Sequence, residues 1–198
     1  MSRKGYTARN LSYLLWRLPR LRRDQWVAHL ASWAGCTEVR AAALLRGAVL
    51  QEKEQKLIAK NAGCTEEQLQ TEGFWEEMAN EDEVNILQEN LRLLTDKRMG
   101  KKLIDIAKES GLKRVSLSRW KSGKHEPKDE GSLARLVLYF GLRPDTNLKA
   151  DPIFLEIDPV GTLMRKEWMH KQIEHIDNQT LNEFFPAFQR LLTDYEAN

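Results

Sequence analysis

Apolar residues recur at intervals of three and four along most of this chain, and runs that alternate apolar with polar residues are scarce. That spacing gathers apolar side chains on one face of an α-helix. Glycines fall between the periodic segments, where a helix end favours a residue that tolerates a positive φ. The pattern therefore predicts an all-α fold built from short helices.

A shift of 76 residues superimposes much of this pattern on itself. The matched positions are Leu11 with Leu87, Leu15 with Leu91, Leu30 with Ile106, Gly35 with Gly111, Gly47 with Gly123 and, after a two-residue insertion, Gly63 with Gly141. The matches are ordered and concern apolar and glycine positions. They therefore indicate a duplicated scaffold rather than a duplicated surface.

Each copy is predicted to hold four helices. Their expected ranges are 8–18, 24–34, 37–46 and 51–62 in the first copy, and 84–95, 101–110, 113–122 and 129–140 in the second. Beyond them, apolar residues alternate between two prolines at 151–159, which predicts a short strand or extended arm. Helices are then expected at 162–176 and 180–193, with Pro186 tolerated only in a first turn that would start near Glu183.

Composition and charge narrow the function classes. The chain has 198 residues, 41% of them apolar and 30% charged, so it can bury a core. The net charge is only +2, but residues 1–50 carry +7, 51–90 carry −8, 91–150 carry +8 and 151–198 carry −5. Basic blocks of this kind predict local faces that bind polyanions.

Several classes are excluded by what the sequence lacks. It shows no membrane-spanning run and no good signal peptide, so we expect a cytoplasmic protein without membrane contact. Cys36 and Cys64 form neither a disulfide framework nor a zinc pattern. His170 and His175 are five apart and do not share a helix face, so no metal site is expected. No catalytic constellation appears, which predicts a non-enzyme with no cofactor and no evident small-molecule ligand.

The segment 103–127 carries the most specific signal in the chain. Its core is S-x-S-R-W-x-x-G-K-x-x-P at 116–127. It resembles the helix-turn-helix of Xre/Cro-type, lambda-repressor-like DNA-binding domains, over about 84–148. Two positions depart from the family pattern, Leu103 at the start of the second helix and Ser110 before the turn glycine.

The residues of this segment suit a helix that enters a major groove. Gly111 sits where the turn needs a left-handed backbone, and Leu117 and Trp120 are spaced to point into the core. The residues left to face outward are Lys113, Arg114, Ser116, Arg119 and Lys121. Arginine can fork onto guanine and serine can adapt to either base type. Flanking lysines, Lys101, Lys102, Lys124 and Lys128, are expected to contact the DNA backbone.

The first copy has the same outline with a weaker surface. In its expected recognition helix, 37–46, the DNA-binding candidates are Thr37, Arg40 and Arg46. Two interpretations stay open. The copy is either a second DNA-binding head, whose phosphate contacts come from Arg17, Arg20, Arg22 and Arg23, or a degenerate copy that forms an interface.

The remaining segments predict assembly. The acidic stretch 71–83 is expected to be a linker whose Phe74 and Trp75 dock on a neighbouring unit. The last helix carries an apolar stripe, Leu181, Phe184, Phe185, Phe188, Leu191 and Leu192. That stripe predicts a homodimer interface through 151–198, and the alternative is that it completes an intramolecular core.

Together these observations predict four parts. They are a degenerate helix-turn-helix unit at 1–70, an acidic linker at 71–83, an Xre-type unit at 84–150, and an extended arm with a helical hairpin at 151–198. The resemblance implies a sequence-specific regulator that binds double-stranded DNA as a dimer and represses by occupying an operator. The alternative is a protein-interaction module of antitoxin or adaptor type, with secondary DNA binding.

Overall fold

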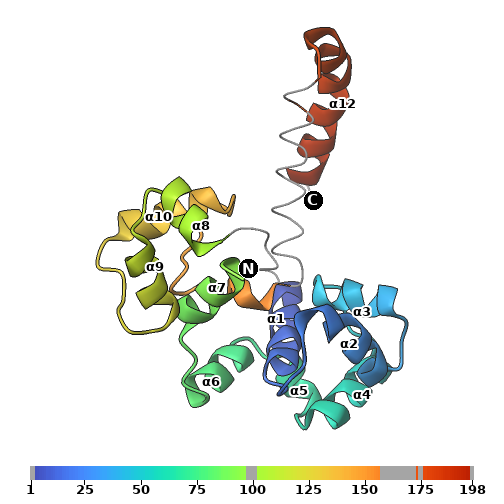
Figure 1. Ribbon diagram of the computed structural model, residues 1–198. Coiled ribbons are helices and arrows are strands. Elements are labelled where there is room, and N and C mark those ends of the chain that lie inside the picture. Colours follow the sequence, from blue (N-terminus) through green and yellow to red (C-terminus); the bar gives the residue numbers. More distant parts are fainter. Residues whose placement is uncertain (1–2, 97–101, 157–172, 174–175, 197–198) are drawn as a thin grey trace. The chain divides into compact units, whose positions relative to one another are not determined.

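A computed structural model of the chain describes residues 3–96, 102–156, 173 and 176–196 (Figure 1). Within this described part, every regular element is an α-helix or a short 3-10 helix, which confirms the all-α class. No described helix has the length and apolar character that crossing a membrane requires. The chain divides into two compact units, Met1–Pro159 and Val160–Asn198, and each is described by itself.

The first half of the larger unit is a run of short helices. They are α1 (Arg3–Trp16), η1 (Arg23–Gln25), α2 (Trp26–Ala34), α3 (Glu38–Leu45), α4 (Glu52–Ala62), α5 (Glu66–Gln70) and α6 (Phe74–Glu81). All the predicted helices are present, and only α1 begins well before its expected start. The expected acidic linker is largely α6, and it buries Phe74 and Trp75.

The second half repeats this order with fewer helices. It contains α7 (Ile86–Leu94), α8 (Leu103–Glu109), α9 (Arg114–Lys121), α10 (Glu130–Tyr139) and η3 (Ile153–Leu155). The strand or extended arm expected at 151–159 is wrong for the described residues. Ile153, Phe154 and Leu155 form a 3-10 turn and are all buried, so this segment belongs to the core of the larger unit.

Two buried asparagines make matching contacts in the two halves. Asn10 of α1 donates its Nδ2 to the carbonyls of Leu69 and Thr71 at 3.1 and 3.0 Å, and accepts the N–H of Trp75 at 3.2 Å. Asn90 of α7 makes the equivalent set of contacts. It donates to Leu148 and Asp151 at 2.9 and 2.7 Å and accepts the N–H of Phe154 at 2.9 Å.

This match changes the alignment of the first helices. Asn10 and Asn90 are 80 residues apart, so Leu11 corresponds to Leu91 and not to Leu87 as the sequence suggested. The chain between the first and second helices is therefore four residues longer in the first half. From α2 onward the shift of 76 holds, because Gly35 and Gly111 both follow a helix with φ of 62° and 69°.

A shared apolar cluster joins the two halves. It contains Tyr13 of α1, Trp75 and Ala79 of α6, and Phe154 and Leu155 of η3. The Trp16 ring lies edge-on to the Phe154 ring, with centroids 5.2 Å apart. Arg23 donates to the carbonyls of Phe154 and Glu156. Contacts from both halves therefore converge on η3.

The smaller unit is described mainly through α12 (Asn178–Glu196). Asp177 accepts the backbone N–H of Thr180 at 2.9 Å and so caps the start of this helix. Pro186 lies inside the helix, so the expectation that the helix starts near Glu183 is wrong. Most of the helix expected at 162–176 lies outside the described residues. The side chains of Phe184, Phe185 and Phe188 are exposed.

Candidate nucleic-acid interface

The pair α8 and α9 is held at a fixed angle by a short turn. Ser110 ends α8, Gly111 follows with a φ of 69°, and Lys113 precedes α9. The Leu112 N–H returns to the Ala107 carbonyl at 2.8 Å, which satisfies one of the last carbonyls of α8. Gly adopts this left-handed conformation without the steric cost that a side chain would add.

The departure at Ser110 is explained by its own helix. Its hydroxyl donates to the Ile106 carbonyl at 2.6 Å, so a polar side chain is accommodated in the core without an unmet hydrogen bond. Helix α10 holds the other side of the turn. Arg135 donates to the Gly111 carbonyl at 3.2 Å, and the Tyr139 hydroxyl donates to Glu109 at 2.9 Å.

Helix α9 has one buried side and one basic side. Leu117 is fully buried and Trp120 is half-buried, as the spacing predicts. Lys113, Arg114 and Arg119 are exposed, whereas Ser116 and Lys121 are half-buried. The helix thus directs two guanidinium groups away from the core that anchors it.

Further lysines border this helix. Lys102 precedes α8, while Lys124 and Lys128 follow α9, and all three are exposed. Lys101 lies outside the described residues. We call the following set the basic surface: Lys102, Lys113, Arg114, Arg119, Lys121, Lys124 and Lys128. Within the part of the chain that the structure describes, none of these side chains forms an ion pair or hydrogen bond.

Helix α3 occupies the corresponding place in the first half but has a different surface. Its positions Glu38, Val39 and Ala43 correspond to Arg114, Val115 and Arg119 under the shift of 76. A carboxylate and a methyl group therefore replace the two guanidinium groups of α9. The expected recognition helix of the first copy lacks the charge that phosphate contact requires.

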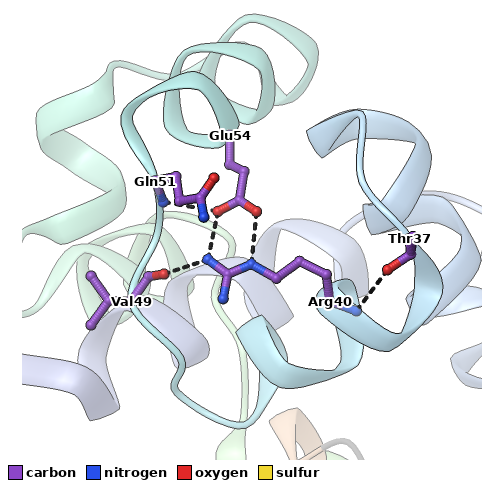
Figure 2. A network of polar contacts seen from close by, with 5 residues as sticks. All are labelled: Thr37, Arg40, Val49, Gln51 and Glu54. Carbon is purple, nitrogen blue, oxygen red and sulfur yellow. Dashed lines mark hydrogen bonds and ion pairs between the residues drawn. The ribbon is translucent and has the colours of Figure 1, made fainter.

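Arg40 was expected to face outward, and the structure places it otherwise. Figure 2 shows its guanidinium between α3 and α4, where Nε and Nη2 each donate to the Glu54 carboxylate at 2.8 Å. Nη2 also donates to the Val49 carbonyl at 2.7 Å. These hydrogen bonds hold the pKa of the buried Glu54 carboxyl below its usual range. Arg40 therefore ties α3 to α4 and is not positioned as a base reader.

The other two candidates of the first copy have local positions. The Thr37 hydroxyl accepts the Arg40 N–H at 3.3 Å and caps α3. Arg46 is the exposed C-cap of the same helix.

The arginines near the N-terminus also make internal contacts. Arg17 pairs with Asp82 at 3.0 Å, and Arg22 pairs with Asp24. Arg23 binds the η3 carbonyls, and its guanidinium lies 4.6 Å from the centre of the Trp26 ring. Much of the +7 charge of residues 1–50 is thus engaged within the fold. Arg20 is exposed and has a φ of 68°.

The cysteines occupy structural positions. Cys36 and Cys64 are half-buried beside the core of the first half, and burial raises the pKa of both thiols. No cluster of potential metal ligands occurs among the described residues. His170 and His175 lie outside that part of the chain.

Sequence reasoning missed two sets of residues, and each had a signal. Asn10 and Asn90 both begin the pattern N-L-x-x-L, 80 residues apart, within otherwise apolar helices. Glu54 stands three residues after Gln51, the spacing of a capping box, and accepts the Gln51 N–H at 2.8 Å. That signature marks Glu54 as a residue turned toward the chain rather than toward solvent.

No protein-family model, curated protein or solved structure matches this chain. The functional argument is therefore built from the residues and contacts of the chain itself.

Proposed function

We propose that the protein is a sequence-specific regulator that binds double-stranded DNA through α8 and α9, acting as a helix-turn-helix. The observation that carries this proposal is the outer side of α9. Arg114 and Arg119 project from a helix anchored by Leu117, in the segment that resembles Xre/Cro-type domains. A helix of this kind fits the width of the B-DNA major groove.

In this mechanism the basic surface divides into two roles. Arg114 and Arg119 read base edges, where a guanidinium can donate two hydrogen bonds to guanine. Lys102, Lys124 and Lys128 bind phosphates, which set the register but carry no sequence information. Occupation of an operator that overlaps a promoter then represses transcription.

The first half serves in this proposal as a scaffold rather than as a second reading head. Arg40 is held by Glu54, and Glu38 stands where α9 has Arg114. These contacts favour the second of the two interpretations open at the level of sequence. The proposed tandem arrangement then supplies one reading head and one modified copy.

Selection from a random duplex library, repeated at several salt concentrations, tests the proposal. We expect an enriched site whose affinity falls steeply with salt. Arg114→Ala and Arg119→Ala should each weaken binding to that site by about 1–3 kcal/mol. Arg92→Ala is the matched control, because Arg92 pairs with Glu89 on α7 and lies outside the basic surface. Unchanged binding by both α9 variants would show that the site assignment is wrong.

The C-terminal helix is proposed to join two copies of the chain. Phe184 is 64% exposed and Phe188 lies one turn further along the same helix. A dimer would bring two α9 helices to paired half-sites. Sedimentation of the wild type and of the Phe184→Ser, Phe188→Ser double variant tests this element. We expect a dimer for the wild type and a monomer for the variant, and a monomeric wild type would contradict homodimerisation.

The same exposed phenylalanines favour a second candidate function. A protein-interaction module of antitoxin or adaptor type would cover this face with a different protein and bind DNA only secondarily. The two functions differ in a measurable way. A monodisperse homodimer that selects a DNA site supports the regulator, whereas a stoichiometric non-self complex without an enriched site supports the module.

A further inference from the structure

Val115 is an apolar residue placed among charged ones. Its side chain is 61% exposed, although Leu117 two residues later is fully buried. Successive helix residues are about 100° apart. Val115 therefore lies near the middle of the exposed face of α9, with Arg114 and Ser118 on one side and Arg119 on the other. No core contact accounts for an apolar side chain there.

The residue type is also unfavourable for this position. A β-branched side chain loses χ1 freedom in a helix, so an exposed valine is a poorer helix former than alanine or lysine. Val39 occupies the same place in α3 and is 83% exposed. The flanking residues differ between the two helices, with Glu38 and Ala43 replacing Arg114 and Arg119. Only α9 thus combines the exposed valine with a cationic surround.

We propose that Val115 contacts the C5-methyl group of a thymine in the major groove and makes the protein select thymine at one position of its site. This inference rests on the proposed DNA-binding function. The thymine methyl is the apolar group that base edges display in the major groove, and valine has no hydrogen-bonding group to offer the other bases. Arg114 and Arg119 hold the helix against DNA, so that two otherwise solvated apolar groups exclude water together.

The same geometry predicts a response to cytosine methylation. A C5-methyl on cytosine projects into the same groove at the same ring position as the thymine methyl. A cytosine placed at the Val115-contacted position should therefore bind more tightly when it is methylated. The difference arises from one methyl group and needs no additional hydrogen bond.

The experiment begins with duplexes enriched from a random library by the full-length protein. Each thymine of the enriched site is then replaced singly by deoxyuridine, which lacks only the methyl group. For the wild type we expect about a fourfold loss of affinity at one thymine, the equivalent of burying roughly one methyl group. Val115→Ala should lose this dependence, and methylcytosine at that position should bind the wild type better than cytosine.

Two further variants control for other effects. Val39→Ala should keep the full uracil penalty, because α3 lacks the cationic surround. Val115→Thr keeps the shape of the side chain while adding a hydroxyl, and it should reduce the penalty without altering the fold. An enriched site at which wild type and Val115→Ala respond equally to every uracil would overturn this inference alone. Failure to enrich any site would overturn the proposed function and the inference together.

Discussion

Replacing Asn90 by alanine should destabilise the larger unit more than any surface substitution. The side chain is fully buried in α7 and bridges three backbone groups, the carbonyls of Leu148 and Asp151 and the N–H of Phe154. Alanine leaves all three groups buried without their partner. Each lost hydrogen bond costs about 1 kcal/mol net, so the free energy of unfolding should fall by about 3 kcal/mol.

Urea unfolding followed by far-UV circular dichroism measures this loss. Asn90→Leu separates hydrogen bonding from volume, because leucine nearly fills the space but restores none of the three contacts. We expect it to be destabilised about as much as the alanine variant. Asn80→Ala on α6 is the matched control, since Asn80 is exposed, and it should change the free energy of unfolding by less than about 0.5 kcal/mol.

The parallel contacts of Asn10 make a second arm of the same test. Asn10→Ala removes an equivalent set of hydrogen bonds in the first half, with slightly longer distances of 3.0 to 3.2 Å. Its cost should therefore be similar or slightly smaller. A loss below about 1 kcal/mol for Asn90→Ala, with an unchanged dependence on urea concentration, would refute the role assigned to these asparagines.

Two further predictions concern contacts around α3 and α9. Glu54→Gln should lower the free energy of unfolding by about 2 kcal/mol near neutral pH, because it removes the carboxylate that binds Arg40. Arg40 lowers the folded-state pKa of Glu54, so this stabilisation is present above the unfolded pKa near 4.3 and is lost as pH falls through the folded value. Urea titrations should show the gap between wild type and variant closing below about pH 4, and a gap independent of pH would contradict the ion pair. Gly123→Ala should cost about 1–2 kcal/mol, since Gly123 has a φ of 71° and an added Cβ would lie 2.9 Å from the Gln88 side chain. Gln88→Ala in the same chain should recover only the part due to the clash, as a double-mutant cycle in urea would measure.

The helices of the larger unit were largely predictable from sequence. Apolar spacing and terminal glycines placed α8, α9 and α10 within two residues of their observed bounds. The offset of the first helix was not, because four extra residues between α1 and α2 hide the match of Asn10 with Asn90. Only the hydrogen bonds of the two asparagines reveal it.

The errors at the C-terminal end have local physical causes. Alternation of Ile153 and Leu155 predicted an arm, yet Phe154 between them is also buried, because Asn90 binds its backbone and Trp16 its ring. Pro186 was assigned to a first turn, but the cap at Asp177 starts α12 earlier. Tertiary contacts and caps decided both segments, and neither is encoded by periodicity.

The candidate site was predictable where side chains stay on their own helix. Helical spacing sufficed to place Leu117 inside and Arg114 and Arg119 outside. It failed for Arg40, whose long side chain reaches Glu54, 14 residues away on the next helix. A residue number along one helix determines the direction of a short side chain better than that of a long one.

The position of Phe154 has a consequence for how the larger unit unfolds. Its N–H is held by Asn90 in the second half, while its ring and carbonyl contact Trp16 and Arg23 in the first. Opening either half would expose the same aromatic ring and break contacts of the other. The two halves should therefore melt in one cooperative transition, and slow amide exchange in α1 and α7 should report a single shared opening event.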